Sequence, residues 1–297
     1  YGASVFVRVE HQGLELARFI YEIRPNPTFI TGVVFNQSRQ TLADIEVSLP
    51  ELGHSATTNQ DGAFIFGPGI PADKTIASGL YSIVINPGGK NPAYGVVEQR
   101  VNIEQGSMND VVSFTLPALD PLMPYNYLSS GQPANVLASG DLIIDTTGAT
   151  LGFADDADAG NVHTQLLPIT SGAYKAQYLE LTPHWMFNLQ PGPITVTGEF
   201  AVEVKMPALF GSRDYLPADG TPVLIMGQDA DSLEITPIGV GVLTGQTVKS
   251  ETPLRTGRLD FIGVNLVAEE SYPVLHDYMN GDISLAQLLV LITSDGQ

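Results

Sequence analysis

Residues 29–66 read FITGVVFNQSRQTLADIEVSLPELGHSATTNQDGAFIF, and this stretch decides the fold of the first half of the chain. Residues 30–35 are rich in β-branched and apolar side chains, and residues 43–49 alternate apolar with polar side chains, so both predict β-strands. Residues 57–66 place an Asp-Gly pair between β-forming residues, which predicts a hairpin. Short strands separated by turn residues indicate a small all-β module.

Three further strands are predicted at residues 79–85, 96–103 and 111–116, with glycine- and proline-rich turns between them. The run from Gly32 through the 43–47 strand to Asp61-Gly62-x-Phe64 resembles the carboxypeptidase-regulatory-like family. Its members are small transthyretin-like β-sandwiches that occur as accessory modules in secreted and surface proteins. The resemblance implies a β-sandwich over residues 28–117, and it implies no catalytic role for that sandwich.

A second module is expected after the proline-rich linker 117–124 (PALDPLMP). Its strands are predicted at residues 140–145, 149–153, 176–183, 200–207, 223–227, 233–241 and 259–264. Residues 206–211 (MPALFG), 222–229 (PVLIMGQD) and 239–245 (GVGVLTG) resemble the fibronectin-plug-like β-sandwich of bacterial surface and Rhs/teneurin-like proteins. The chain departs from that pattern, because Leu233 stands where the family has a tryptophan and the YD repeats are absent.

The two ends of the chain carry different patterns. Residues 4–10 and 14–23 alternate in polarity and predict a β-hairpin, which is marginal in water on its own. We therefore expect residues 1–27 to be the tail of a preceding domain or strands that pair with another subunit. At the other end, residues 272–279 and 283–292 predict short helices, the second with Asp282 as its N-cap.

The predicted fold class is therefore all-β, with tandem β-sandwiches and a short C-terminal helical segment. The predicted parts are the hairpin at 1–27, the carboxypeptidase-regulatory-like sandwich at 28–117, and a second sandwich with its C-terminal helix at 125–297. The chain begins at Tyr1 without a signal-peptide pattern, so we expect a processed precursor or a fragment of a longer protein.

The amino-acid composition limits which classes of partner and which kinds of site are expected. The formal net charge of −19 comes from 32 acidic and 13 basic residues, and a surface this negative repels nucleic acid and anionic lipid. No apolar run is long enough to span a membrane. The chain has no cysteine, which excludes disulfides, zinc-thiolate sites and thiol nucleophiles. The absence of cysteine together with few lysines fits an extracellular or cell-surface protein of bacterial type, and it fits many cytosolic proteins as well.

The best candidate for a metal site is the acidic loop DDADAGN at residues 155–161. Asp155, Asp156, Asp158 and Asn161 supply hard oxygen ligands of the kind that Ca²⁺ prefers, on a loop closed by glycine. The alternative is a solvated acidic turn in an already acidic protein. Asp229 and Asp231 form a weaker candidate pair of the same kind, and we expect these two carboxylates to be solvated rather than bound to a metal.

Catalytic patterns are missing from the sequence. The five histidines show no metal-binding spacing, and no Gly-x-Ser-x-Gly elbow is present. An aromatic platform for a sugar is conceivable from four aromatic residues, although core packing is the better expectation. These residues are Tyr174, Tyr178, Trp185 and Phe187.

The sequence therefore predicts a non-enzymatic, extracellular structural segment, either a rigid spacer or a unit of a filament or surface protein. Its partners would be other proteins or further copies of itself, met through β-strand edges. The N-terminal hairpin is the expected contact element. The alternative is a binding module for glycan or for calcium-dependent adhesion.

Overall fold

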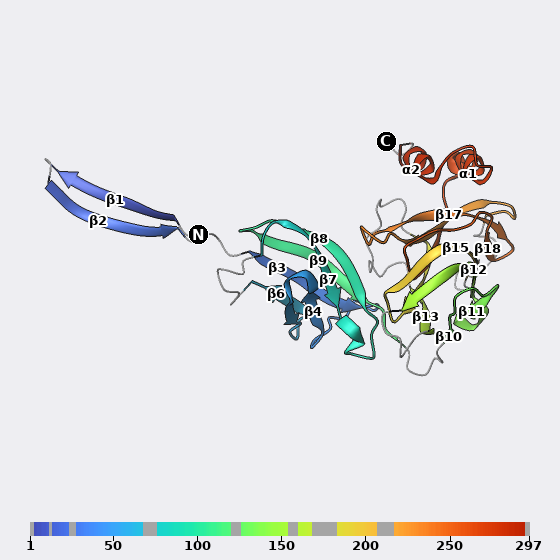
Figure 1. Ribbon diagram of the computed structural model, residues 1–297, viewed down its shortest axis with the longest axis horizontal. Coiled ribbons are helices and arrows are strands. Elements are labelled where there is room, and N and C mark those ends of the chain that lie inside the picture. Colours follow the sequence, from blue (N-terminus) through green and yellow to red (C-terminus); the bar gives the residue numbers. More distant parts are fainter. Residues whose placement is uncertain are drawn as a thin grey trace.

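The computed structural model describes residues 3–11, 14–23, 28–67, 76–119, 126–153, 160–167, 183–206 and 217–294. Within these residues the chain forms an N-terminal hairpin, a first module at residues 28–119 and a second module at residues 126–294. Figure 1 shows the three parts following one another along the longest axis of the molecule.

The hairpin consists of β1 (Ala3–His11) and β2 (Leu14–Ile23), which form a two-stranded antiparallel sheet of their own. Val5 lies opposite Tyr21 and Val7 lies opposite Phe19 in its register. A bulge follows Val9. The two predicted strands therefore form an antiparallel ladder with one bulge.

The first module is a sandwich of two sheets. One sheet has the order β6-β3-β9, from β3 (Phe29–Asn36), β6 (Ala63–Phe66) and β9 (Met108–Leu116). The other has the order β5-β4-β7-β8, from β4 (Glu46–Leu49), β5 (His54–Thr57), β7 (Gly79–Ile85) and β8 (Val97–Ile103). Both sheets contribute alternate residues to one core, in which Val34, Val47, Phe64, Ile83 and Phe114 are buried.

The Asp61-Gly62 turn is present, but the predicted hairpin around it is wrong. Strand β5 pairs with β4 in one sheet, whereas β6 pairs with β3 in the other, so the turn carries the chain across the sandwich. The Thr58 side chain fixes the crossing point, because its buried hydroxyl donates to the Leu42 carbonyl and accepts from the Ile45 N–H. Gly62 has φ +70°, and a Cβ there would lie 2.6 Å from the Val34 carbonyl oxygen.

The second module is one continuous ten-stranded sheet, with the order β10-β13-β14-β19-β16-β17-β18-β15-β12-β11. An added pairing of β15 with β19, at Thr195 and Arg258, joins two distant parts of this order. The sheet therefore curls round a single core and supplies both of its layers. The strands are β10 (Asn126–Tyr127), β11 (Asn135–Leu137), β12 (Leu142–Phe153), β13 (Asn161–Leu167), β14 (Trp185–Gln190), β15 (Ile194–Lys205), β16 (Pro222–Gln228), β17 (Ile235–Thr244), β18 (Thr247–Ser250) and β19 (Arg258–Asn265).

Two helices, α1 (Tyr272–Met279) and α2 (Leu285–Ser294), lie over the second module beside β17 (Figure 1). Leu275 and Leu288 are buried against Leu224, Met226 and Val240 in a separate apolar cluster. The predicted cap at Asp282 is wrong. The Ser284 hydroxyl, which lies next to the helix, accepts from the Gln287 N–H at 3.3 Å.

The all-β fold with tandem sandwiches and a short C-terminal helical segment is confirmed. Two strands predicted at 140–145 and 149–153 form the single strand β12, which bulges between Asp145 and Gly148. The bulge interrupts the alternation of side chains, which explains why the sequence pattern reads as two strands. No helix in the described ranges is long and apolar enough to cross a membrane.

Candidate functional site

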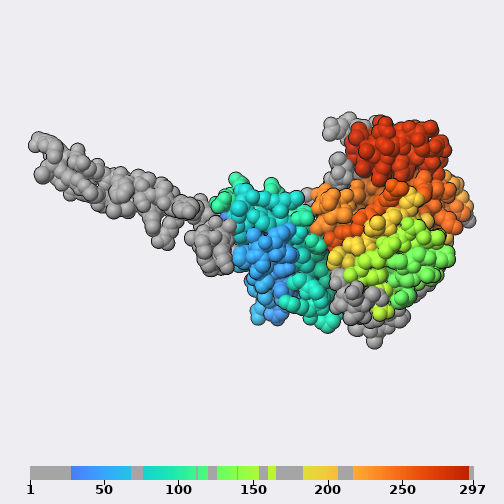
Figure 2. All heavy atoms as spheres, viewed as in Figure 1, coloured from blue at the N-terminus to red at the C-terminus, as the bar shows by residue number. Residues whose placement is uncertain are grey.

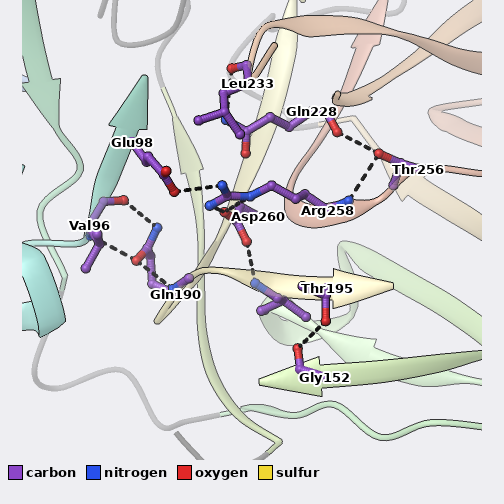
Figure 3. Close-up of polar contacts among 12 residues, drawn as sticks. Val96, Glu98, Gly152, Gln190, Thr195, Gln228, Leu233, Thr256, Arg258 and Asp260 are labelled. Carbon is purple, nitrogen blue, oxygen red and sulfur yellow. Dashed lines mark hydrogen bonds and ion pairs between the residues drawn. The ribbon is translucent and has the colours of Figure 1, made fainter. Parts of the chain in front are cut away.

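The joint between the two modules holds a polar network, largely buried, that links distant parts of the chain (Figure 3). Gln190, the last residue of β14, has its side chain directed at Val96, which immediately precedes β8. Gln190 Oε1 accepts from the Val96 N–H at 2.9 Å, and Gln190 Nε2 donates to the Val96 carbonyl at 3.1 Å. The side-chain amide thus pairs with Val96 as a neighbouring β-strand would.

Gly95 makes this approach possible. A Cβ on Gly95 would lie 2.9 Å from Pro117 Cγ and 3.0 Å from Gln190 Cδ. The Gly95 N–H also donates to the Pro117 carbonyl at 2.8 Å, and the Leu119 N–H donates to the Ala93 carbonyl at 2.8 Å. The end of the first module is therefore fastened at the point where it meets Gln190.

An ion-pair network lies beside Gln190. Arg258, at the start of β19, donates through Nε at 3.0 Å and Nη2 at 2.6 Å to one carboxylate oxygen of Asp260. Its Nη1 donates to Glu98 Oε2 on β8 at 2.8 Å, which carries the network into the first module. The other oxygen of Asp260 accepts from the Ile194 N–H at 2.7 Å. Only 11% of the Arg258 side chain and 5% of the Asp260 side chain are exposed.

Burial and the neighbouring charges shift the pKa values of Asp260 and Arg258. Burial raises the pKa of the Asp260 carboxyl above its ordinary value, although Arg258 and the Ile194 N–H oppose that rise. Burial alone would lower the pKa of Arg258, but the attraction of Asp260 and Glu98 outweighs burial and raises it. The guanidinium is therefore held charged between two carboxylates, one from each module.

Backbone placement explains how these residues meet. Arg258 and Asp260 are two positions apart on β19 and therefore lie on the same face of the strand. Thr256 supports the strand start, because its hydroxyl donates to the Gln228 carbonyl at 2.6 Å (Figure 3). The space-filling view shows the first module directly against the second (Figure 2). The joint therefore couples the two modules through directional hydrogen bonds and a buried ion pair.

The predicted calcium ligands are only partly placed. Asp155, Asp156 and Asp158 lie outside the described residues. Asn161 is exposed at the start of β13, where it lies opposite Tyr127 of β10. Within the ranges that the structure describes, no three acidic or histidine side chains are grouped as metal ligands. The calcium site remains a prediction.

The weaker acidic pair has a role in local structure. One carboxylate oxygen of Asp229 accepts from the backbone N–H groups of Asp231 and Ser232, at 3.0 Å and 2.7 Å, and closes the turn before β17. Burial alone would raise the pKa of Asp229, but these hydrogen bonds outweigh it and lower that pKa.

Two of the four aromatic residues considered as a sugar platform are core residues. Trp185 is 5% exposed and Phe187 is 2% exposed, and both belong to the core of the second module. Tyr174 and Tyr178 lie outside the described residues. The core interpretation of Trp185 and Phe187 is confirmed.

Sequence reasoning missed the joint. Gln190 and Val96 are 94 residues apart, and Arg258 and Glu98 are 160 apart, so no motif brings them together. One indication was available, since Arg258 and Asp260 alternate with apolar residues in a strand that continues as FIGVN. Charges in a buried strand need partners, and that requirement points to an ion pair.

No protein-family model matches this chain, and no curated protein matches it. It shows partial likeness to solved structures. The streptococcal ancillary pilin is 8% identical, with 89% of this chain and 71% of that chain covered and a TM-score of 0.25. The Bacillus anthracis TIE protein is 9% identical, with 90% of this chain and 56% of that chain covered and a TM-score of 0.24.

A type II cohesin–X-dockerin complex from Acetivibrio cellulolyticus is 15% identical, with 32% of this chain and 61% of that chain covered and a TM-score of 0.22. This chain thus spans less than two thirds of that relative. TM-scores this low define no common topology. The resemblances to the carboxypeptidase-regulatory-like and plug-like families therefore remain predictions.

Proposed function

We propose that this chain is a non-enzymatic structural segment of an extracellular or cell-surface protein. It acts as a rigid two-module spacer that assembles with its neighbours through β-strand edges. The observation that carries this proposal is the buried joint, in which Gln190 pairs with the backbone of Val96 and Arg258 bridges Glu98 and Asp260.

Rigidity follows from the kind of contact at the joint. Modules joined only by a solvated linker move relative to one another by default. Here a rotation would leave the Gln190 amide and the Arg258 guanidinium buried without all of their partners, and unpaired buried polar groups are costly. Each contact is also directional, so the joint favours one angle between the modules.

Distance measurements between spin labels test the rigidity. The chain has no cysteine, so Ser55→Cys and Gln246→Cys, both at exposed positions, would be the only labelled residues. We expect a narrow distance distribution, and a broader one when Gln190→Ala and Glu98→Ala are added. The matched control adds Gln60→Ala, an exposed residue of the first module. A broad distribution in the parent protein would contradict the spacer role.

Ligand titrations separate the spacer from the alternative, a module for glycan or calcium-dependent adhesion. A spacer predicts no heat on calorimetric titration with Ca²⁺ and no binding on a glycan array. Calcium binding that is lost in Asp156→Asn/Asp158→Asn would instead favour the adhesion module. Selective binding to one glycan class would favour it as well.

Assembly has its own test. Deleting residues 1–24 removes the hairpin and leaves both module cores intact. We expect this variant to be a folded monomer at concentrations where the full chain associates, as measured by analytical ultracentrifugation. Equal association of both proteins would contradict a contact role for the hairpin.

A further inference from the structure

We propose that β8 of the first module is the docking edge for the hairpin of a second copy, which adds its strand β1 to the open side of sheet β5-β4-β7-β8. This inference rests on the assembly role proposed above, and it specifies the acceptor strand and the donor strand. The contact would be head-to-tail, because donor and acceptor are different surfaces.

The hydrogen bonds of β7 show which way its backbone groups point. The Ser82 N–H donates to Glu51 Oε1 at 2.9 Å, and the Asn86 N–H donates to the Glu46 carbonyl at 2.8 Å. Glu46 belongs to β4, and Glu51 follows that strand in the chain. The even-numbered positions along β7 and just after it therefore form their hydrogen bonds on the side of β4, away from β8.

The register carries this direction over to β8. Ser82 lies opposite Arg100, and Leu80 lies opposite Asn102. When one residue of such a pair turns its N–H and carbonyl away from the partner strand, the opposite residue does the same. Glu98, Arg100 and Asn102 therefore present their backbone groups on the outer side of β8, while the odd-numbered residues pair with β7.

Within the described part of the chain, no strand pairs with this outer side. The sheet order ends at β8, which lies along the border of the first module (Figure 1). Natural edges are commonly blunted by proline or lysine, and β8 contains neither. Its two charged side chains are already held in ion pairs, Glu98 with Arg258 and Arg100 with Glu51. The edge is therefore a ready template for a further strand.

Both ends of this edge are closed by a side-chain amide that pairs as a neighbouring strand would. At one end is the Gln190 pair with Val96. At the other end Asn109 Oδ1 accepts from the Glu104 N–H at 2.8 Å, and Asn109 Nδ2 donates to the Glu104 carbonyl at 3.0 Å. Positions 96 and 104 share the even-numbered outer side. Between the two amides lies an open slot, formed by the seven residues of β8, Val97–Ile103.

The other described edges of the two modules suit strand addition less well. Strands β5 and β6 have four residues each, and β10 and β11 have two and three. Strand β9 is longer, but its register against β3 carries one extra residue between Asp110 and Ser113. A bulge of this kind interrupts pairing and twists an edge away. The slot on β8 is therefore the longest regular edge among them.

Strand β1 is a donor of matching length. Residues 3–9 pair one to one with residues 17–23, whereas the register shift after Val9 places the extra residue, Leu16, on β2. The bulge bends β2 and leaves β1 with a regular run of seven residues, the length of the slot. Pairing through this edge uses the backbone of β1, so it does not depend on the side chains of the hairpin.

A second copy is the occupant that the arrangement favours. The hairpin forms a sheet of its own beyond the end of the first module, whereas the slot runs alongside that module (Figure 1). Residues 1–27 hold three arginines and three glutamates, so the whole net charge of −19 falls on residues 28–297. Two bodies this acidic repel one another, and the neutral hairpin is the part that approaches an acidic neighbour with least repulsion.

Backbone pairing of this length predicts modest affinity. Glu98, Arg100 and Asn102 offer one N–H and one carbonyl each, so an added strand forms up to about six hydrogen bonds. Each such bond replaces a bond to water, and its net contribution is small. We therefore expect concentration-dependent association that sedimentation measures at high protein concentration.

Hydrogen exchange, read residue by residue by NMR, tests the acceptor edge. In the protein without residues 1–24 the amides of Arg100 and Asn102 should exchange rapidly, and those of Gln99 and Val101, which face β7, slowly. In the associated full chain, exchange at Arg100 and Asn102 should slow roughly tenfold or more, with little change at the alternate amides. Rapid exchange of Arg100 and Asn102 in the associated protein would overturn the proposed edge.

A proline substitution tests the same edge by association. Asn102→Pro removes an outward N–H and spares the ladder to β7, and proline is tolerated at such edge positions. This variant should melt like the parent and associate no more than the protein without residues 1–24. Asn102→Ala keeps the N–H and is the matched control, which should associate like the parent. A folded proline variant that associates like the parent would overturn the slot. If deletion of residues 1–24 still abolished assembly, the assembly role would stand.

Mixing tests the donor. The deletion variant keeps the slot, and Asn102→Pro keeps the hairpin. Each alone should be monomeric, and an equal mixture should give heterodimers that grow no further. A mixture that stays monomeric would overturn the proposed contact. Protected Arg100 and Asn102 amides in a monomeric parent would show that the slot takes the hairpin of its own chain, which would overturn the second copy. A parent that is monomeric at every concentration, with both amides unprotected, would overturn this contact and the assembly role together.

Discussion

The side-chain amide of Gln190 forms hydrogen bonds with both the N–H and the carbonyl of Val96, at 2.9 Å and 3.1 Å. Gln190 ends a strand of the second module, and Val96 precedes a strand of the first. One buried side chain therefore completes the hydrogen bonding of a backbone segment in another module. The two modules are coupled by directional bonds as well as by surface contact.

Replacing Gln190 should uncouple the modules. Gln190→Ala removes both hydrogen bonds and leaves the Val96 backbone groups without them, at a cost of about 1–3 kcal/mol for a buried unpaired group. We expect calorimetry to show two separate unfolding transitions for the modules of this variant, whereas the two modules of the parent protein unfold in a single transition. Gln60→Ala, at an exposed position, should leave the melting profile unchanged. A single unaltered transition in Gln190→Ala would contradict coupling through this residue.

Arg258 should matter more than Glu98 for stability. Arg258→Ala leaves the buried carboxylate of Asp260 without its cation, and breaking a buried ion pair in this way costs roughly 3–5 kcal/mol. Glu98→Ala leaves the Arg258–Asp260 pair intact, and 23% of the Glu98 side chain is exposed, so its effect should be smaller. Urea unfolding of both variants measures the difference. An equal loss in the two would contradict a central role for Asp260.

Gly95 should tolerate no side chain. In Gly95→Ala the new Cβ would lie within 3.0 Å of Pro117 and Gln190, so the joint must open or shift. We expect a loss of roughly 1–3 kcal/mol, as overpacking of a filled site commonly costs. Gly79→Ala is the control, because its Cβ would have no neighbour closer than 3.4 Å. Equal stability of the two variants would show that the joint adapts.

The sequence predicted the layers of this fold better than its connections. Alternation identified strands such as β3 and β7 because one face of each is buried, and that is a local property. Strand pairing is not local. The Asp61-Gly62 turn was found correctly, but its flanking strands belong to different sheets, since Thr58 ties the chain to Leu42 and Ile45.

The joint could not be predicted for the same reason. Gln190 has no local feature that distinguishes it from an ordinary strand-end residue. The positions of Arg258 and Asp260 in the sequence indicate a buried ion pair, because charges at alternate positions of an apolar strand require partners. They give no indication that Glu98 is the third residue of this ion-pair network. That contact depends on how the two modules meet, which no sequence spacing encodes.

His184 should make the second module sensitive to mild acid. Burial lowers the pKa of its imidazole below 6.5, with a hydrogen bond to Asn265 opposing that shift, and its Nδ1 accepts from the Leu266 N–H at 3.2 Å. The folded state therefore binds a proton less readily than the unfolded state. Stability is full above the unfolded pKa of about 6.5 and falls as the pH drops below it, until the folded group also titrates.

The measurement is the free energy of unfolding between pH 7.5 and 5.5 for the parent and for His184→Asn. The asparagine side-chain oxygen can accept from the Leu266 N–H, and it does not titrate in this range. We expect the parent to lose more stability than the variant over the interval, because only the parent's unfolded state gains a proton at residue 184. The other four histidines are the same in both proteins, so their contribution cancels in the comparison. Parallel curves for the two proteins would show that protonation of His184 is not linked to folding.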